Sequence, residues 1–314
     1  MRRMINIAVL AVMLISISVF YCAADTVPVC RTVEEASDAL RPALKNREEM
    51  KAVCLITDTP ASESEALISE IFDGAIEHTG NPSEGDYLRF QYNTCSASAK
   101  PVSADGADAI LFTYAVTYYD TAEQEAAVDD KVAEIIESLD LEDKTDYNKI
   151  VSIYNYVCGN VKYDYDNLED DEYYLKHTAY GALIDGKAVC QGYSMALYRL
   201  LLEAGVDNRV IFGIGTGTGG EQGNHTWNIV KVGDEYYNTD VTGDSESELS
   251  HYFLKGSASF DDDHVRSDEY LTEAFTEAYK VSEDDYWFDS LKDHLGSLTE
   301  SIKSMAKRIM DVVQ

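Results

Sequence analysis

One cysteine occupies a position that suits a nucleophile. Cys190 begins an apolar helical pattern that runs to Ala204, and the residues from Gly186 to Val189 offer no Ser, Thr, Asp or Asn to cap that helix. The positive end of the helix dipole favours a thiolate, and uncapped backbone N–H groups can hold an oxyanion. A lone cysteine is often only a small buried apolar residue, so catalysis here needs partner residues.

A histidine and an aspartate lie on a predicted hairpin downstream of this cysteine. Gly233-Asp234 between two apolar runs is typical of a two-residue hairpin turn, and this turn places His225 opposite Thr242. Asp240 is two residues from Thr242 and therefore on the same face of the sheet, within reach of the imidazole. A carboxylate that holds one imidazole nitrogen leaves the other free to take a proton from a thiol. The pattern therefore predicts a Cys-His-Asp set for nucleophilic catalysis.

Three sequence blocks around these residues resemble the transglutaminase-like superfamily, and more narrowly its secreted bacterial branch. The blocks are Gly186-Lys187-Ala188-Val189-Cys190-Gln191-Gly192-Tyr193, His225-Thr226-Trp227-Asn228 and Tyr236-Tyr237-Asn238-Thr239-Asp240-Val241-Thr242. Further similarity lies in Tyr163-Asp164, Tyr252-Phe253-Leu254 and His264. The resemblance covers the chain from about Thr145 to His264 and implies a papain-like fold with a Cys-His-Asp triad in that order.

The resemblance also implies a role for each residue of the triad. Cys190 would be the nucleophile, His225 the general base and then the general acid, and Asp240 the carboxylate that orients the imidazole. The Cys190 N–H would donate to the oxyanion; Tyr180 and His177 are candidates for the second donor, with ordinary packing or surface roles as the alternative. The reaction would be acyl transfer from an amide through a thioester. We expect neither a cofactor nor a metal.

Other patterns suggest ligands but lack the required context. Residues 215–220 match GxGxxG after a predicted strand, but a strand rather than a helix follows, so we interpret them as a loop beside the site that could act as a lid. The acidic runs at 164–171 and 261–263 could offer oxygen ligands to calcium, but they lack EF-hand spacing and are expected to be solvated faces. The cysteines form no CxxC pair, so no zinc site is indicated.

Residues 25–122 are predicted to form a small N-terminal α/β domain of order α-β-α-β-β, without a catalytic pattern. The expected elements are a helix over 32–46 with a break at Pro42, a strand from Met50 to Thr57, a helix with a Ser62–Glu65 capping box that stops at Gly80, and strands Tyr87–Cys95 and Ala109–Tyr119.

Residues 123–288 are predicted to form the transglutaminase-like catalytic domain, an α+β core with helices followed by an antiparallel sheet. We expect a helix capped at Thr145, the Cys190 helix ending before Gly205, and strands over 209–214, 226–232 and 235–240. Residues 289–314 carry a heptad pattern and are predicted to form a C-terminal amphipathic helix that docks on its own domain rather than zipping two chains.

The first residues are typical of a secretory signal peptide. Residues 1–24 have two arginines, an apolar run and small residues before Asp25, which predicts cleavage near Ala24 and a secreted protein. The alternative is a membrane anchor formed by residues 5–24. Export permits disulfides among Cys30, Cys54, Cys95 and Cys158, and the odd number that remains with Cys190 leaves one thiol spare, but sequence cannot give the pairing.

The charge of the chain limits its partners. With 57 acidic and 25 basic residues the net charge is −32, so nucleic acid and anionic lipid are disfavoured. A hydrophobic fraction of 45% is too high for a disordered polyacid.

Two hypotheses about function follow from the sequence. One is a secreted thiol enzyme acting on protein or peptide amides, cell-wall peptides included, with hydrolysis ranked above crosslinking because no amine-acceptor site is evident. The other is an extracellular binding or scaffold module that keeps the fold without turnover. The oligomeric state stays open.

Overall fold

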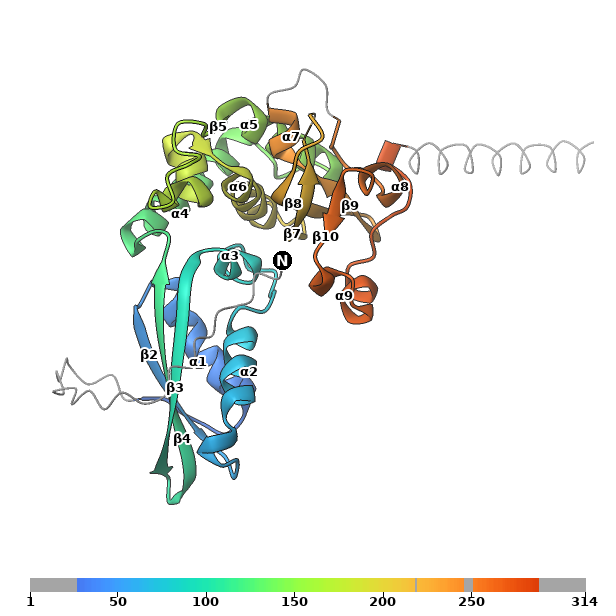
Figure 1. Cartoon of the computed structure of the whole chain (residues 1–314). Coiled ribbons are helices and arrows are strands. Elements are labelled where there is room, and N and C mark those ends of the chain that lie inside the picture. Colours follow the sequence, from blue (N-terminus) through green and yellow to red (C-terminus); the bar gives the residue numbers. More distant parts are fainter. Residues whose placement is uncertain (1–26, 218, 246–250, 288–314) are drawn as a thin grey trace, which may run out of the picture.

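The computed structural model describes residues 27–217, 219–245 and 251–287 of the 314-residue chain. The predicted signal peptide (1–24) and C-terminal helix (289–314) lie outside the described residues. The described chain forms two lobes, and each lobe combines helices with one of the two four-stranded sheets (Figure 1). The predicted α+β class is therefore correct. None of the described helices combines the length and hydropathy needed to cross a membrane.

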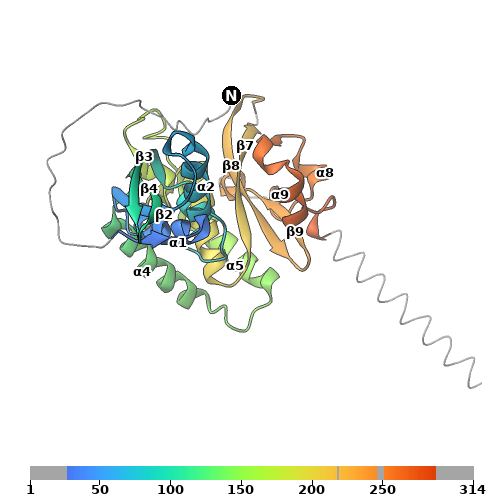
Figure 2. The same cartoon turned by 90° about the horizontal axis from the view of Figure 1, so that it is seen from below.

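The N-terminal lobe is a mostly antiparallel sheet covered by two helices (Figures 1 and 2). Its strands are β1 (Val29–Cys30), β2 (Met50–Ile56), β3 (Tyr92–Ala104) and β4 (Ala107–Tyr118), in the order β1-β2-β4-β3. Its helices are α1 (Val33–Lys45) and α2 (Glu65–Ala75), with the short turn η1 (Ala61–Glu63) before α2. Alternate residues of β4, from Ile110 to Val116, belong to the hydrophobic core between the sheet and the helices of this lobe, as expected for a half-buried strand.

Helix boundaries in this lobe differ from those expected. Pro42 lies inside α1 instead of breaking it, because it is in the last turn, where the missing N–H costs one hydrogen bond and few residues follow. The Ser62–Glu65 capping box is not formed: the preceding residues make η1, and α2 begins at Glu65 without a side-chain cap. The helix ends at Ala75, ahead of the predicted stop at Gly80.

The predicted strand Tyr87–Cys95 is also wrong at its start. Its first residues form the short helix α3 (Asp86–Arg89), and β3 begins only at Tyr92. Beyond Cys95, β3 continues to a tight turn at Asp105-Gly106, where both φ angles are positive, at 51° and 77°. This is the backbone geometry of a two-residue hairpin turn, and it joins β3 to β4.

Three helices form the centre of the C-terminal lobe. They are α4 (Ala122–Leu139), α5 (Asp146–Asn160) and α6 (Cys190–Glu203). Thr145 caps α5 as predicted, and Gly205, with φ of 77°, follows the end of α6. Most side chains of α6 from Gln191 to Leu202 are buried, so the helix that carries the candidate nucleophile is the core of the lobe.

An antiparallel sheet lies beside α6, as the sequence predicts. Its strands are β7 (Asn208–Thr216), β8 (Gln222–Val232), β9 (Glu235–Thr239) and β10 (His264–Arg266), in the order β10-β7-β8-β9. The turn at Gly233-Asp234 is confirmed, with Val232 paired to Glu235. The short parallel pair β5 (Lys162–Tyr163) and β6 (Lys187–Ala188) precedes α6. The remaining short elements are η2 (Tyr174–His177), η3 (Gly181–Asp185), α7 (Val241–Ser245), α8 (Ser257–Phe260), η4 (Asp268–Tyr270) and α9 (Glu273–Ala278).

The two lobes are joined by buried polar contacts as well as by the chain. Asp86 of α3 accepts hydrogen bonds from Arg209 Nε at 2.7 Å, from Arg209 Nη2 at 2.8 Å and from the Val210 N–H at 2.8 Å. Gln191, the residue after the candidate nucleophile, donates from Nε2 to the Phe90 carbonyl at 2.7 Å. The N-terminal lobe therefore contacts the first turn of α6.

The cysteines of the described residues are all free thiols. They are Cys30, Cys54, Cys95, Cys158 and Cys190. Thiols therefore occupy the positions at which export would permit disulfides.

Candidate active site

Cys190 is the first residue of α6 and is half-buried. Its N-cap residue, Val189, provides no side-chain cap, as the sequence predicts. The Val189 N–H donates to the Lys176 carbonyl at 2.9 Å, which brings the segment before the helix against its first turn. Gly192 allows this approach, because a Cβ there would lie 2.8 Å from the Lys176 carbonyl oxygen and 3.0 Å from that of Thr178. The positive end of α6 is thus available to the thiol.

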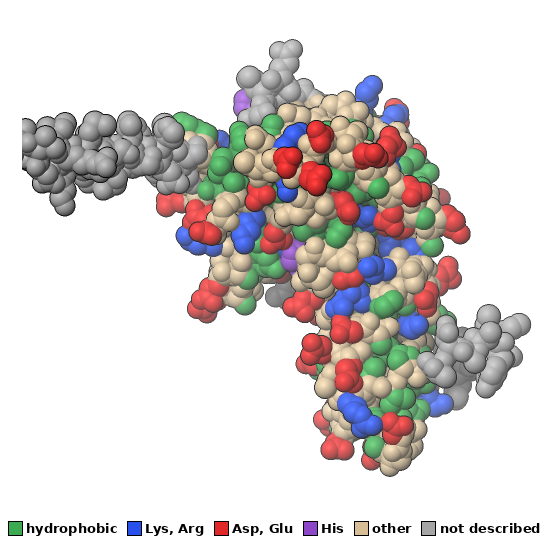
Figure 3. All heavy atoms as spheres, turned by 180° about the vertical axis from the view of Figure 1, so that it is seen from behind, with side chains coloured by type: hydrophobic (Ala, Val, Ile, Leu, Met, Phe, Trp, Pro, Cys, Tyr) green, Lys and Arg blue, Asp and Glu red, His purple; other side chains and the backbone are tan. Residues whose placement is uncertain are grey.

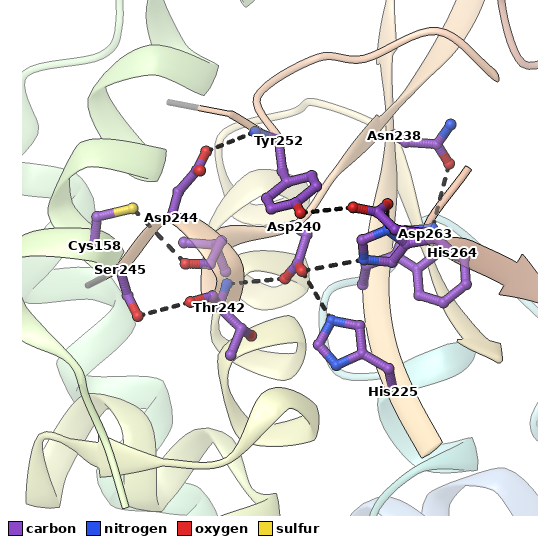
Figure 4. Close-up of polar contacts among 12 residues, drawn as sticks. Cys158, His225, Asn238, Asp240, Thr242, Asp244, Ser245, Tyr252, Asp263 and His264 are labelled. Atoms are coloured by element: carbon purple, nitrogen blue, oxygen red, sulfur yellow. Dashed lines mark hydrogen bonds and ion pairs between the residues drawn. The ribbon is translucent and has the colours of Figure 1, made fainter. Parts of the chain in front are cut away.

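The predicted contact between His225 and Asp240 is present (Figure 4). His225 Nε2 lies 2.8 Å from Asp240 Oδ2. The pairing of His225 with Thr242 is not formed, because the β8–β9 register ends at Asn228 opposite Thr239 and the chain turns into α7 directly after Asp240. Asp240 therefore reaches the histidine from the end of its strand rather than as a cross-strand diagonal neighbour.

Both carboxylate oxygens of Asp240 are held. Oδ2 faces His225, and Oδ1 accepts the Thr242 N–H at 3.0 Å. The backbone N–H of Asp240 also donates to the Tyr252 carbonyl at 3.1 Å. Its side chain is 3% exposed, against 19% for that of His225. Burial alone would raise the pKa of Asp240, but the charges and hydrogen bonds of His225 and His264 outweigh it and hold the pKa well below its usual range. Asp240 is therefore ionised at neutral pH.

Cys190 and His225 stabilise each other in charged form. With Nε2 committed to Asp240, Nδ1 is the nitrogen left for the thiol. Burial opposes the thiolate, but the hydrogen bond and charge of His225, helped by Thr226, lower the pKa of Cys190. Burial also opposes the imidazolium, but Asp240 and then Cys190 raise the pKa of His225 to about 11. These opposite shifts favour a thiolate–imidazolium pair over a neutral thiol and imidazole.

Gly215 makes room for the imidazole. A Cβ at this position would lie 3.0 Å from both Cβ and Cγ of His225, closer than carbon atoms pack. Gly215 lies in β7, and the glycine-rich residues 215–220 lead from that strand into β8. No helix follows them, so the setting of a dinucleotide site is absent there, as the sequence indicated. Glycine is needed at position 215 for a steric reason instead, because a side chain there would collide with His225.

His264 is a second histidine on Asp240, and the sequence pointed to it only through the family resemblance. Its Nε2 lies 3.4 Å from Asp240 Oδ2, and its Nδ1 lies 2.6 Å from Asp263 Oδ1 (Figure 4). His264 begins β10, at the opposite edge of the sheet from β9, which precedes Asp240. Periodicity relates residues within one strand or across one turn, so it could not connect these two edges.

One group within the described ranges has the spacing of a metal site. The ligand atoms of His225, Asp240 and His264 lie within 4.8 Å of one another. Their hydrogen bonds to each other and to Asp263 already pair these groups, so we assign His225 and Asp240 to the triad and His264 to its surroundings rather than to a metal. The expectation of no metal stays a prediction.

The acidic loop at 164–171 has an internal cation. Lys176 Nζ donates to the carbonyls of Asn167, Leu168 and Asp170 at 2.7, 3.0 and 2.7 Å. The carboxylate of Asp164 accepts from the Asn167 side chain. These bonds occupy carbonyls that a calcium ion would need.

The second oxyanion donor stays undetermined. The His177 ring lies against that of Tyr119, with centroids 5.7 Å apart, and Tyr180 packs on the core around α6. The role of the Cys190 N–H as the first donor stays a prediction.

Comparison with known families bears on this geometry. The model of the transglutaminase-like superfamily matches residues 133–241. These residues belong to that superfamily. The match includes Cys190, His225 and Asp240, and the resemblance found in the sequence is confirmed. We call this part of the chain the transglutaminase-like domain.

Solved structures similar to the chain include a transglutaminase and a candidate cysteine protease from Cytophaga hutchinsonii. The transglutaminase is 17% identical with a TM-score of 0.35, and the match covers 71% of this chain and 61% of that one. The Cytophaga hutchinsonii protein is 10% identical with a TM-score of 0.32, and the match covers 56% of this chain and 69% of that one. The chain thus matches less than two thirds of the length of the first of these structures. No curated protein matches it.

Proposed function

We propose that this protein transfers acyl groups from protein or peptide amides through a Cys190-His225-Asp240 triad, with water as the usual acceptor. The observation that carries the proposal is the contact between His225 and Asp240 beside Cys190. The thiol at an uncapped helix N-terminus interacts with the imidazole of His225, whose Nε2 lies 2.8 Å from a buried carboxylate. This is the arrangement that nucleophilic acyl transfer requires.

The groups would act in two steps. The Cys190 thiolate attacks the amide carbonyl carbon, and the oxyanion that forms accepts from the Cys190 N–H. His225 then gives its proton to the leaving nitrogen as the C–N bond breaks, which yields a thioester and a free amine. In the second step His225 takes a proton from water as its oxygen attacks the thioester, and the C–S bond breaks to return the thiolate. Asp240 keeps the imidazole oriented and stabilises its charge throughout.

Hydrolysis is ranked above crosslinking because water needs no binding site, whereas an amine acceptor does. The same thioester would react with a lysine amine if one were held at the site. On the face of the molecule shown in Figure 3, acidic side chains are spread over both lobes. With a net charge of −32, the protein would suit neutral or cationic peptides, including cell-wall peptides, and would disfavour nucleic acid. Because residues 1–24 have the pattern of a signal peptide, we propose that it acts outside the cell.

The proposal is tested by following three products from one protein substrate. Purified protein is incubated with unfolded, reduced and alkylated lysozyme, a cationic protein, and a fluorescent primary amine, and new N-termini, released ammonia and incorporated amine are measured. Wild type should give new N-termini or ammonia, and Cys190→Ala should give none. Cys95→Ala, which removes a thiol from the N-terminal lobe whose pKa burial raises to about 12, is the matched control and should keep full activity. Because lysozyme represents one substrate class, neutral peptides and cell-wall fragments are tested in parallel.

Amine incorporation without hydrolysis would assign the protein to crosslinking instead. Activity that survives Cys190→Ala would refute the mechanism. An unreactive Cys190 thiol in folded, reduced protein would favour the binding-module hypothesis.

A further inference from the structure

His264 is placed between two carboxylates. Its Nδ1 lies 2.6 Å from Asp263 Oδ1, and its Nε2 makes a longer contact of 3.4 Å with Asp240 Oδ2 (Figure 4). Tyr252 donates its hydroxyl to the other oxygen of Asp263 at 2.7 Å. An ionised carboxylate only accepts hydrogen bonds, so a proton on Nδ1 or Nε2 of His264 is donated to the carboxylate that this nitrogen faces.

The ring of His264 cannot turn away from these partners. It is 4% exposed and stacks on Phe260, with ring centroids 3.9 Å apart. Trp227 and Tyr252 meet it edge to face, with centroid distances of 5.1 and 5.2 Å. Both nitrogens are therefore fixed on their carboxylates by packing, in a position where a buried polar group without partners would be costly.

The contact connects His264 to the proposed triad through a single oxygen atom. Asp240 Oδ2 faces both His225 and His264, while Oδ1 accepts from the backbone of Thr242. Imidazole and carboxylate groups then alternate from His225 through Asp240 and His264 to Asp263. Each buried carboxylate faces a ring nitrogen that can donate a hydrogen bond to it, which lowers the cost of burying it.

We infer that His264 is a positioning residue, which donates to Asp240 and holds it at His225 without touching the substrate. This inference rests on the proposed function, because it assigns a role within the same site. The charged and titratable groups that face His264 come from β8, the end of β9 and the segment before β10. They are His225, Asp240, Tyr252, Asp261 and Asp263.

Two replacements separate the nitrogens of His264. Glutamine places its amide nitrogen near the Nε2 position and can still donate to Asp240, whereas asparagine places it near Nδ1 and reaches only Asp263. The rate of Cys190 alkylation by iodoacetamide is measured from pH 5 to 10 for wild type, His264→Gln and His264→Asn, with thermal unfolding as the folding control. The asparagine variant should lose ~10- to 100-fold in rate at neutral pH, because a loosened Asp240 lets His225 drift from the thiol. The glutamine variant should restore most of that loss.

Equal alkylation rates for the two variants at equal thermal stability would show that His264 only fills space, and would overturn the inference.

A second measurement does not depend on catalysis. In labelled Cys190→Ala protein, nitrogen NMR should find a proton on His264 Nε2, the nitrogen that faces Asp240. An Nε2 without a proton would overturn the inference whether or not Cys190 is reactive in the wild type. Conversely, a proton on Nε2 together with an unreactive Cys190 in the wild type would uphold the contact with Asp240 and remove the proposed function.

Discussion

Replacing Gly215 with alanine should displace His225 and slow the alkylation of Cys190. The added Cβ would lie 3.0 Å from Cβ and Cγ of His225, whereas carbon atoms pack at about 3.5–4.0 Å, so the overlap is roughly 0.5–1 Å. The Gly215 backbone is held between its partners His264 and Gly223 on the two neighbouring strands. The imidazole is therefore the group that gives way. Overpacking of this kind costs about 1–3 kcal/mol, and we expect about a tenfold loss of rate, since each ~1.4 kcal/mol corresponds to that factor.

The assay compares alkylation rates of wild type, Gly215→Ala and Gly223→Ala at pH 7, with thermal unfolding measured in parallel. Gly223 is the matched control: it lies directly opposite Gly215, and a Cβ there meets nothing within 4 Å. Gly223→Ala should keep the wild-type rate and lose no stability. A Gly215→Ala protein with wild-type rate and stability would refute the steric argument.

Three further predictions concern charged groups in the site and between the lobes. Asp240→Asn should raise the pH midpoint of Cys190 alkylation toward about 8.5, because the imidazolium of His225 loses its carboxylate partner. An unchanged midpoint would contradict this role of Asp240. Arg209→Met should destabilise the protein by about 3–5 kcal/mol in urea unfolding, because it leaves Asp86 buried without its ion pair; a loss below about 1 kcal/mol would show that the pair is dispensable. In the folded protein the pKa of His225 is raised from 6.5 to about 11, so the stability contributed by its charge is complete below pH 6.5 and is lost as the pH rises toward 11. The difference in urea midpoint between wild type and His225→Gln should therefore shrink over that range. A constant difference would contradict the raised pKa.

Local signals in the sequence were sufficient for much of the catalytic region. Thr145 caps its helix and Gly205 follows the Cys190 helix, because caps depend on one residue and the backbone next to it. The turn at Gly233-Asp234 fixes the β8–β9 register, because a two-residue turn also depends only on its own residues and the adjacent backbone. The His225–Asp240 contact was therefore within reach of sequence reasoning, although the strand ended earlier than expected.

The expectations that failed depended on distant residues. Tyr87 has the character of a strand residue, but the Asp86–Arg209 contact fixes that segment as α3 against the other lobe. His264 reaches Asp240 from the far edge of the sheet, a relation that no local pattern encodes. Pro42 predicts a helix break, but it is tolerated in the last turn of α1, and its place in that turn depends on where α1 ends. Such tertiary effects override local propensity.

The most direct test of the proposed mechanism is the pH profile of Cys190 alkylation, with the modified residue located by mass spectrometry. We predict selective labelling of Cys190 well below the ordinary thiol pKa of about 8.5, and loss of that low-pH reactivity in His225→Ala. Cys95 and Cys158, whose pKa values burial raises to about 12, should stay unlabelled in the same range. Labelling of Cys190 only near or above pH 8.5, unchanged by His225→Ala, would contradict the thiolate–imidazolium pair on which the proposed function rests.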